Sequence, residues 1–247
     1  MKRQAIVLAA GKGSRLQSEK KQLPKVLREA NGKALLSYVL EHLSFLPSED
    51  IAIVVGFMAE KVKEHAGPAY KYYEQKEQLG TGHAVQMAQD FLDQEADADV
   101  LICYGDMPLI SEETYRGMLE QRERTGAEAC ILAFDTDLPL AYGRIIRDGT
   151  GAFKEVVEER DCTEEQKKIQ ELNAGVYVFK ARQLARLLGQ LRNNNAQNEY
   201  YLTDLPALII AEGGRVEVYC TKGRYEGFGV NTEEELAIAE RELSAQA

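Results

Sequence analysis

Short apolar runs alternate with helical patterns through the first half of this 247-residue chain, and this alternation limits the fold more than any other feature. The runs cover residues 5–9, 51–55, 71–73, 100–104 and 129–134. Several are almost continuously apolar, which is typical of strands that are covered on both faces. Strand–helix alternation in turn predicts a largely parallel sheet with right-handed crossovers. We therefore expect an α/β fold, with helices flanking a mixed, mostly parallel sheet.

Helical spacing of apolar residues predicts helices around residues 35–43 and 84–92. A third helix is expected to begin at Ser111, followed by acidic residues that suit a helix N-terminus. After residue 134 the rhythm changes, and residues 143–147 and 152–157 flank a turn-forming Asp-Gly-Thr-Gly segment, which predicts a β-hairpin.

The rest of the chain predicts a more irregular second half. A charged segment at 158–171 reads as a loop with one short helix capped by Thr163 and Gln166, and Thr232 with Glu235 forms a capping box. Further elements are expected as a strand at 172–179, helices at 181–191 and 205–212, a strand at 216–219 and a last helix at 232–244. Because no linker, repeat or low-complexity stretch interrupts the sequence, we expect residues 1–247 to form one domain.

Composition excludes some broad classes of protein. The net charge of −10 argues against general nucleic-acid binding, and no apolar run approaches the roughly 20 residues needed to span a membrane. The apolar stretch at the N-terminus is too short for a signal peptide, so a buried strand is the better interpretation. The cysteines, at 103, 130, 162 and 220, show no C-x-x-C spacing and fit reduced, buried thiols in a cytosolic protein.

Basic residues are concentrated in one segment of this acidic chain. Between Lys12 and Lys33 there are seven basic residues against Glu19 and Glu29. A basic segment beside glycines indicates a site for a small polyanion, although a solvated loop explains the same charges.

The glycines of that segment directly follow the first strand, in the sequence Ala-Ala-Gly-Lys-Gly-Ser-Arg-Leu at 9–16. Glycines there let backbone N–H groups approach phosphate oxygens closely. No Gly-Lys-Ser/Thr follows at Walker spacing. Leu16 occupies the third glycine position of a dinucleotide loop, and no acidic residue ends the second strand. These absences argue against a Walker loop and against NAD binding.

Further motifs follow in order along the chain, and together they identify a family resemblance. They are residues 8–15 (LAAGKGSR), 23–27 (LPKVL), 77–84 (EQLGTGHA), 104–109 (YGDMPL), 142–145 (YGRI), 173–175 (NAG), 193–204 (NNNAQNEYYLTD) and 229–231 (GVN). The sequence resembles the nucleotide-diphospho-sugar pyrophosphorylases over essentially its whole length. It is most similar to the uridyltransferase domain of bifunctional N-acetylglucosamine-1-phosphate uridyltransferases.

The resemblance implies a Rossmann-like nucleotide-diphospho-sugar transferase fold and a cytoplasmic enzyme that makes nucleotide sugars, precursors of the cell wall. It implies UTP and N-acetylglucosamine-1-phosphate as substrates, UDP-N-acetylglucosamine and pyrophosphate as products, and Mg²⁺ as cofactor. The nucleotide-binding half would cover about residues 1–110 and the sugar-binding half about 111–231.

The resemblance also implies roles for individual residues. Arg15 and Lys25 would be catalytic, and Asp106 and Asn231 would hold the metal. The nucleotide would be bound by Leu8, Ala9, Ala10, Gly11, Gly13, Gln75, Gly80 and Thr81, and the sugar by Tyr104, Gly143, Glu158 and Asn173. The chemistry agrees, because cations fixed beside a departing pyrophosphate stabilise the charge that develops there. Pro24 is expected to hold Lys25 in an extended loop.

Each of these residues also has a simpler interpretation. Lys25 fits an exposed loop lysine, Asp106 and Asn231 fit caps of turns, and Thr81 fits a helix N-cap. Gln75 fits a surface position, Tyr104 fits the strand core, and Glu158 fits a solvated charged run.

Two other functions remain open. One is the same reaction with another base or sugar phosphate, and the other is a non-catalytic regulatory or nucleotide-sugar-binding domain on the same fold. The bifunctional relatives continue into hexapeptide repeats that form a trimeric acetyltransferase β-helix. This sequence has no such repeats, so neither acetyl transfer nor that trimer is expected.

Overall fold

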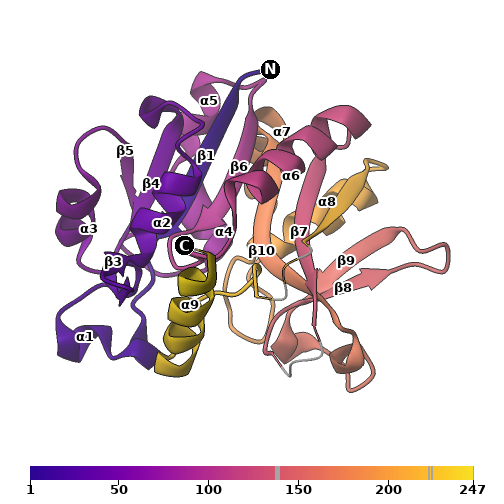
Figure 1. The fold of residues 1–247 in the computed structure, drawn as a ribbon. Helices are drawn as coiled ribbons and strands as arrows, with labels where there is room; N and C mark the ends of the chain where they lie inside the picture. The colour runs from indigo at the N-terminus through magenta and orange to yellow at the C-terminus, as the bar shows by residue number, and fades with distance from the viewer. Residues whose placement is uncertain (137–139, 222, 224, 247) are drawn as a thin grey trace.

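A nine-stranded sheet forms the centre of the structure, a computed structural model that describes residues 1–136, 140–221, 223 and 225–246. Seven strands follow the order β11-β7-β10-β6-β1-β4-β5, and β8 and β9 extend from β10 as an antiparallel ribbon (Figure 1). The strands are β1 (Arg3–Ala9), β4 (Ile51–Val55), β5 (Lys71–Glu74), β6 (Asp99–Tyr104), β7 (Ala129–Asp135), β8 (Arg144–Arg147), β9 (Phe153–Val157), β10 (Glu171–Lys180) and β11 (Val216–Thr221). A separate small ribbon pairs β2 (Glu29–Ala30) with β3 (Lys33–Ala34).

Most strands of the central path run in the same direction. Strand β1 pairs in parallel with β4 and β6, β4 with β5, and β11 with β7. Strand β10 is antiparallel to both of its neighbours on this path, β6 and β7. The predicted α/β class with a mixed, mostly parallel sheet is therefore confirmed.

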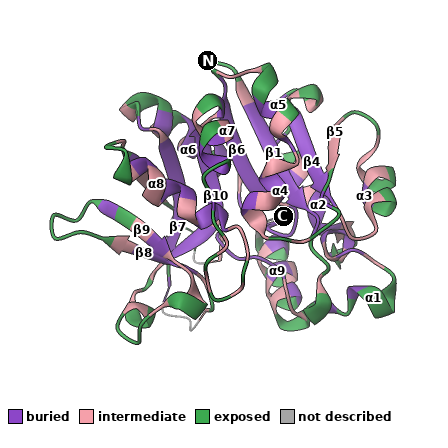
Figure 2. Cartoon of the chain, turned by 180° about the vertical axis from the view of Figure 1, so that it is seen from behind, coloured by how far each residue is buried: buried purple, intermediate pink, exposed green. Residues whose placement is uncertain are grey.

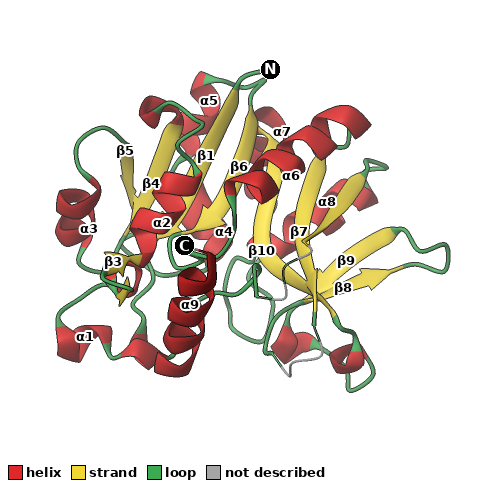
Figure 3. Ribbon diagram, in the orientation of Figure 1, coloured by secondary structure: helices red, strands yellow, loops and turns green. Residues whose placement is uncertain are grey.

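Helices cover both faces of the sheet (Figure 3). On one face, α2 (Leu35–His42), α3 (Ala59–Ala66) and α6 (Glu112–Thr125) pack against Val7 and its neighbours. On the other, the core that contains Ile6 and Leu8 also includes residues of α4 (Thr81–Gln86), α5 (Gln89–Gln94), α7 (Ala181–Leu188) and α8 (Leu205–Ala211). Because successive strand residues point to opposite faces, a continuously apolar strand supplies both cores, and the central strands are buried (Figure 2). None of the described helices is long and apolar enough to cross a membrane.

Two helices, α1 (Ser18–Lys21) and α9 (Glu233–Gln246), lie beyond the carboxyl ends of the parallel strands (Figure 1). Helix α1 lies in the segment between Arg15 and Lys25, and Gln17 and Gln22 on either side of it have φ angles of 53° and 52°. Helix α9 buries Leu236, Ala239 and Leu243 in a third, smaller core together with Leu16.

Three helix-start signals in the sequence are confirmed. The Ser111 hydroxyl accepts a hydrogen bond from the Thr114 amide, 3.2 Å away, at the start of α6. Thr232 and Glu235 exchange side-chain-to-backbone hydrogen bonds, and Thr163 and Gln166 do the same. These local bonds satisfy backbone groups that a helix start leaves unpaired.

Other expectations about the helices were wrong. The helix expected at 84–92 is two helices, α4 and α5, because the chain tightens at Ala88, whose amide bonds the carbonyl of Val85 three residues back. The helix expected at 181–191 ends at Leu188. Neither α3 nor the β2–β3 ribbon was predicted, since α3 has only one fully buried apolar residue, Val62.

The four cysteines are free thiols, but their burial differs from the expectation. Cys103 and Cys130 are buried in β6 and β7, as the apolar runs predicted, and Cys162 is partly buried. Cys220 is exposed, near the end of β11, an edge strand of the sheet.

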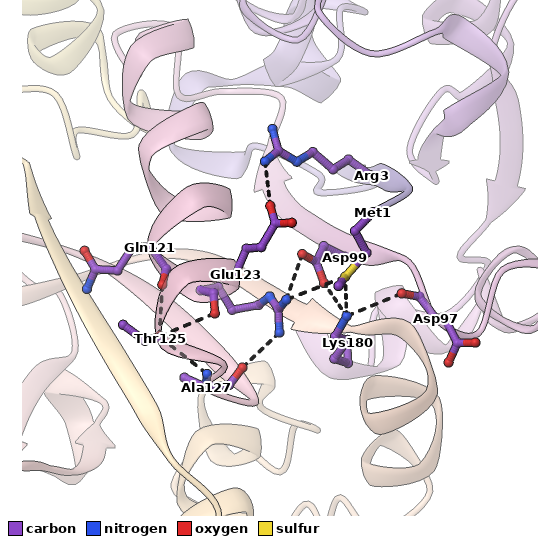
Figure 4. A network of polar contacts seen from close by, with 10 residues as sticks. Met1, Arg3, Asp97, Asp99, Gln121, Glu123, Thr125, Ala127 and Lys180 are labelled. Atoms are coloured by element: carbon purple, nitrogen blue, oxygen red, sulfur yellow. Dashed lines mark hydrogen bonds and ion pairs between the residues drawn. The ribbon is translucent and has the colours of Figure 1, made fainter.

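A buried ionic cluster lies at the opposite end of β6 from the glycine loop (Figure 4). Asp99 is fully buried, and its two carboxylate oxygens lie 3.0 Å from an Arg122 nitrogen and 3.2 Å from Lys180 Nζ. Arg122 also donates to the carbonyl of Ala127 at 3.0 Å. This cluster joins the first residue of β6 to α6 and to the end of β10.

Candidate active site

The glycine loop and the other predicted site residues gather beyond the carboxyl ends of β1 and β6. Ala9 pairs with Val55 and Leu8 with Tyr104, so these strands finish level with one another. The loop at 10–13 follows β1, and Asp106 follows β6 in a turn. Ligands on open α/β sheets bind at this edge.

Two adjoining cavities open here. The smaller, of about 260 Å³, is lined by the glycine-loop residues Leu8, Ala9, Ala10 and Gly11 and by Gly80. The larger, of about 380 Å³, is lined by Arg15, Gly143, Glu158, Asn173 and Asn231 among others. Five residues line both cavities: Lys25, Thr81, Tyr104, Asp106 and Glu199. A hollow between α6 and β11, of about 670 Å³, contains none of the predicted site residues.

A lysine, a carboxylate and an amide meet where the cavities join. The Nζ atom of Lys25 lies 2.5 Å from Oδ2 of Asp106 and donates to Oδ1 of Asn231 at 3.1 Å. Asp106 is buried, and the side chain of Lys25 is only 17% exposed, so solvent screens this pair weakly. The interpretation of Lys25 as a loop lysine exposed to solvent was wrong.

The backbone around Lys25 differs from the expectation. Lys25 begins a single 3₁₀ turn, Lys25–Leu27, and Pro24 is the extended residue before it. Proline restrains the residue that precedes it, here Leu23, and leaves the residue that follows free to enter a helical turn.

Arg15 is exposed at the rim of the larger cavity, on the short 3₁₀ turn Ser14–Leu16. Within the part of the chain that the structure describes, its guanidinium makes no hydrogen bond or ion pair. It is therefore available to an anion that enters the cavity.

Two predicted nucleotide residues do not line either cavity, and both support the walls. Gly13 has a φ of +61°, and a Cβ there would lie 2.6 Å from Cβ of Lys25, so only glycine allows the loop to pack against the lysine. Gln75 is buried, not on the surface, and its amide donates to the carbonyl of Gly80 at 3.0 Å. Gln78, which was not singled out, lines the smaller cavity instead.

The Gly80–Thr81 turn is bonded to the segment that follows α7. Gly80 has a φ of +113°, and a Cβ there would lie 2.6 Å from the Tyr200 carbonyl oxygen. The Thr81 hydroxyl accepts from the Leu202 amide at 3.1 Å, and Thr81 is the first residue of α4 and not its N-cap. These contacts bring the 197–203 segment to the cavities.

Residues of this segment extend the site beyond the sequence prediction. Gln197, Glu199, Tyr201 and Thr203 all line the larger cavity. They belong to the 193–204 motif, and the concentration of polar residues in that motif was the signal available in the sequence. Tyr142 and Glu235, in two other motifs, were also missed.

The far wall of the larger cavity is built around a bulge in β10. The pairing of β10 with β7 shifts between Asn173 and Tyr177, and Gly175 inside the bulge has a φ of +80°. The Asn173 side chain donates to the Tyr177 hydroxyl at 2.7 Å and accepts from the Gly175 amide at 3.0 Å. A Cβ on Gly175 would lie 2.9 Å from the Tyr104 ring, so the absence of a side chain at this position leaves room for that ring.

Glu158 faces the cavity from the end of β9. Burial raises the pKa of its carboxyl group, and the Thr203 hydroxyl, which donates to Oε1 at 2.9 Å, opposes that rise. Burial likewise raises the pKa of the Tyr104 phenol well above its ordinary value. Tyr104 therefore stays protonated at neutral pH and can donate a hydrogen bond.

The oxygens around Lys25 also fit a divalent cation. Oδ2 of Asp106 and Oδ1 of Asn231 both lie within 3.1 Å of one nitrogen, so the two oxygens converge on one small volume. Mg²⁺ is usually held by one or two protein oxygens together with substrate phosphates. Among the described residues no group of three or more His, Cys, Asp or Glu side chains could hold a metal without such help.

Known proteins resemble this chain in sequence and in fold. Two bacterial proteins named bifunctional protein GlmU align over 98% of this chain, one from Staphylococcus epidermidis at 40% identity and one from Staphylococcus haemolyticus at 42%. The chain spans about half (53%) of the length of each. A solved UDP-glucose pyrophosphorylase in complex with UDP-glucose shares the fold, with a TM-score of 0.82 and 19% identity over 100% of both chains.

The family assignment rests on the sequence. The domain described as MobA-like NTP transferase matches residues 5–197, which include the glycine loop, Lys25, Asp106 and Asn173. The resemblance that the motifs indicated is thereby confirmed. This chain belongs to the MobA-like NTP transferase domain family.

Proposed function

We propose that this protein is a sugar-1-phosphate nucleotidyltransferase, which converts UTP and N-acetylglucosamine-1-phosphate to UDP-N-acetylglucosamine and pyrophosphate. The observation that carries the proposal is the pair of adjoining cavities whose common wall holds Lys25 and Asp106. Two substrates that react through their phosphates need separate pockets that meet at a charged point. The GlmU relatives, alike over nearly the whole of this chain, support the choice of sugar and base.

The reaction needs positioning and charge neutralisation more than proton transfer. An oxygen of the sugar phosphate forms a bond to the α-phosphorus of UTP. The bond between that phosphorus and the oxygen that bridges to the β-phosphate breaks. Pyrophosphate leaves with the electron pair of the broken bond. The attacking monoester is mostly dianionic near neutral pH, since its second pKa is about 6, so no general base is required.

In this proposal Arg15 and Lys25 bind the phosphates. Both cations stabilise the negative charge that grows on the departing pyrophosphate. Arg15 makes no hydrogen bond or ion pair with the rest of the described chain, and Lys25 is held by Asp106 and Asn231, so the two differ in preorganisation. We expect Lys25 to matter more for the rate and Arg15 more for substrate capture.

We propose Mg²⁺ as the cofactor, with Asp106 and Asn231 as its protein ligands. When bound, the ion would neutralise phosphate charge and help to align the triphosphate. The fit rests on the convergence of their oxygens on Lys25 Nζ.

The proposed substrate contacts divide between the cavities. The loop at 8–11, with Gly80 and Thr81, binds the nucleotide in the smaller cavity, while Gly13 and Gln75 act by holding its walls. Tyr104, Gly143, Glu158 and Asn173 bind the sugar in the larger one. We add Glu199 and Gln78 to the set on their positions in the walls. Use of a nucleoside triphosphate and the scattered free cysteines support a cytoplasmic location.

A transferase of the same kind with another base or sugar is the nearest alternative, and a silent nucleotide-sugar-binding domain is a more distant one. A silent domain has no need of Arg15, Lys25 and Asp106 around one cavity, and all three are there.

The test is pyrophosphate release from purified protein with Mg²⁺, four nucleoside triphosphates and a panel of sugar-1-phosphates. Fastest release with UTP and N-acetylglucosamine-1-phosphate supports the proposal, and a preference for another pair corrects the substrates. Nucleotide-sugar binding without release from any pair identifies a silent domain.

A further inference from the structure

The segment that carries Asn231 enters the site from the end of β11 and is held there by hydrogen bonds that two of its backbone amides donate. The Gly229 amide donates to the Tyr142 hydroxyl at 2.8 Å, and the Val230 amide donates to the carbonyl oxygen of Asp106 at 2.9 Å. Tyr142 and Asp106 both line the larger cavity. These two anchors are therefore part of the site itself.

Glu226 provides a further anchor outside both cavities. One of its oxygens accepts from the Ser111 amide at 3.1 Å, the Ser111 hydroxyl at 2.7 Å and the Thr114 hydroxyl at 2.5 Å. Its other oxygen accepts from the Thr221 hydroxyl. One partly buried carboxylate thus joins the end of β11 to the first turn of α6. Hydrogen bonds to an ionised acceptor are about twice as strong as neutral ones, and a helix N-terminus favours negative charge.

The segment between Glu226 and Asn231 is short and tightly packed. Only residues 227–230 separate Glu226 from Asn231. The first of them, Gly227, is pressed against Phe134 of β7, and a Cβ there would lie 2.3 Å from the ring. A shift of Glu226 is therefore transmitted along a packed segment and is not absorbed by a loose loop.

We propose that Glu226 is a positioning residue for the metal and phosphate site, which it serves by fixing the 226–231 segment so that Oδ1 of Asn231 faces Lys25 and Asp106. The proposal rests on the metal role proposed above for Asn231. Glu226 itself touches no substrate, because it lines neither cavity.

The first test compares Glu226→Gln with Glu128→Gln. Glu128 is a matched control, since it also fixes a turn next to β11, by accepting from the Arg215 amide at 2.7 Å, but at the other end of that strand. We expect Glu226→Gln to raise the Mg²⁺ concentration for half-maximal activity about tenfold or more, because loss of a group that orients a metal ligand weakens metal binding by about that factor. In metal-free protein, amide hydrogen exchange at 225–231 should also become faster. Glu128→Gln should change neither quantity.

The second test is a double-mutant cycle with Asn231→Ala. If Glu226 acts through Asn231, adding Glu226→Gln to Asn231→Ala changes the Mg²⁺ dependence no further. Additive effects, or a Glu226→Gln variant with a lower Tm but unchanged Mg²⁺ dependence and exchange, overturn the positioning role while the proposed function stands. An unchanged Mg²⁺ dependence in Asn231→Ala itself contradicts the metal role, and the positioning proposal falls with it.

Discussion

Lys25 and Asp106 form an ion pair of 2.5 Å in the wall shared by the two cavities. The side chains are 17% and 7% exposed, so each charge depends on the other for compensation. A triphosphate with its cation offers both charges new partners, since phosphate oxygens suit the lysine and a metal suits the carboxylate. Under the proposed function, the pair therefore holds both side chains in place before the substrate binds.

Replacement of this lysine tests the phosphate contact. We expect Lys25→Ala to lower the rate of pyrophosphate release by about 10²–10³-fold, because a fixed cation beside the leaving group is lost. Lys63→Ala is the control, since Lys63 pairs with Glu60 on the exposed face of α3. Near-normal turnover in Lys25→Ala would remove the lysine from the mechanism.

Replacement of the carboxylate tests the metal. Asp106→Asn keeps the shape of the side chain but removes its charge, so we expect a higher Mg²⁺ requirement and a turnover roughly 10²-fold lower. Asp93→Asn on α5 is the control, since the Asp93 carboxylate accepts a hydrogen bond from Gln89 on the same helix and Asp93 is not among the described residues that line either cavity. Activity should be titrated against Mg²⁺ concentration for each variant. An Asp106→Asn curve that overlays the parent curve excludes Asp106 as a ligand.

Alanine variants of two glycines with similar φ angles distinguish backbone strain from crowding of the Tyr104 ring. Gly175 and Gly151 have φ angles of +80° and +86°, but a Cβ meets the Tyr104 ring only at Gly175, and nothing lies within 4 Å at Gly151. Both alanine variants should lose about 1–3 kcal/mol of stability from the unfavourable backbone. Only Gly175→Ala should also raise KM for the sugar phosphate, because Tyr104 must move. Equal KM values in the two variants would show that Tyr104 does not contact the substrate.

Asp204, beside the larger cavity, makes stability depend on pH. Burial, and then the charge of Asp161, raise the pKa of Asp204 from 3.8 to about 6. An acid with a raised pKa in the folded state contributes stability below pH 3.8, and that contribution is lost as the pH rises through 6. Asp204→Asn should therefore be more stable than the parent at pH 7.5, by about 1 kcal/mol after solvent screening, and equal to it below pH 4.

A carboxyl group whose pKa is shifted in the opposite direction provides the comparison. Hydrogen bonds from the Thr150 side chain and backbone lower the pKa of Asp148, so its contribution is present at neutral pH and lost as the pH falls. Asp148→Asn should be less stable than the parent at pH 7.5 and equal to it in acid. Thermal unfolding of the three proteins between pH 3.5 and 7.5 measures both effects, and parallel curves would refute them.

The ionic cluster at the far end of β6 should affect stability alone (Figure 4). Asp99→Asn leaves the guanidinium of Arg122, 3% exposed, without its counter-charge. Breaking a buried pair from one side costs about 3–5 kcal/mol. We expect a much lower Tm with kcat unchanged for the folded fraction. A lower kcat at a temperature where the variant is folded would contradict this separation.

Local signals in the sequence predicted local structure well, and contacts between distant segments poorly. The helix caps at Ser111, Thr163 and Thr232 each depend on residues no more than three positions apart in the sequence, and all three caps are present. The direction of β10 could not be read, since a continuously apolar strand shows only that both its faces are buried. The short ribbon β2–β3 carries too few residues to give a pattern.

The same limit applies to the site. Many of the residues that line the cavities lie in the motifs, although only some of them were assigned a role. The motifs did not separate Gln78, in the wall, from Gln75, buried behind it, since that depends on how one turn packs on Tyr200. Glu226 gave no signal, because its partner Ser111 lies 115 positions away.

Strand β10 belongs to the second half of the chain, yet it lies between β6 and β7 and pairs with both. The floors beneath the two cavities are thus one continuous hydrogen-bonded surface, without a seam about which two lobes could swing apart. Entry of substrates and departure of the bulky product must then be accommodated by the rim, meaning the segments around 140–143, 197–203 and 225–231. Changes in those segments are then expected to alter which sugar is accepted, while the proposed phosphate-binding loop beyond the ends of β1 and β6 stays as it is.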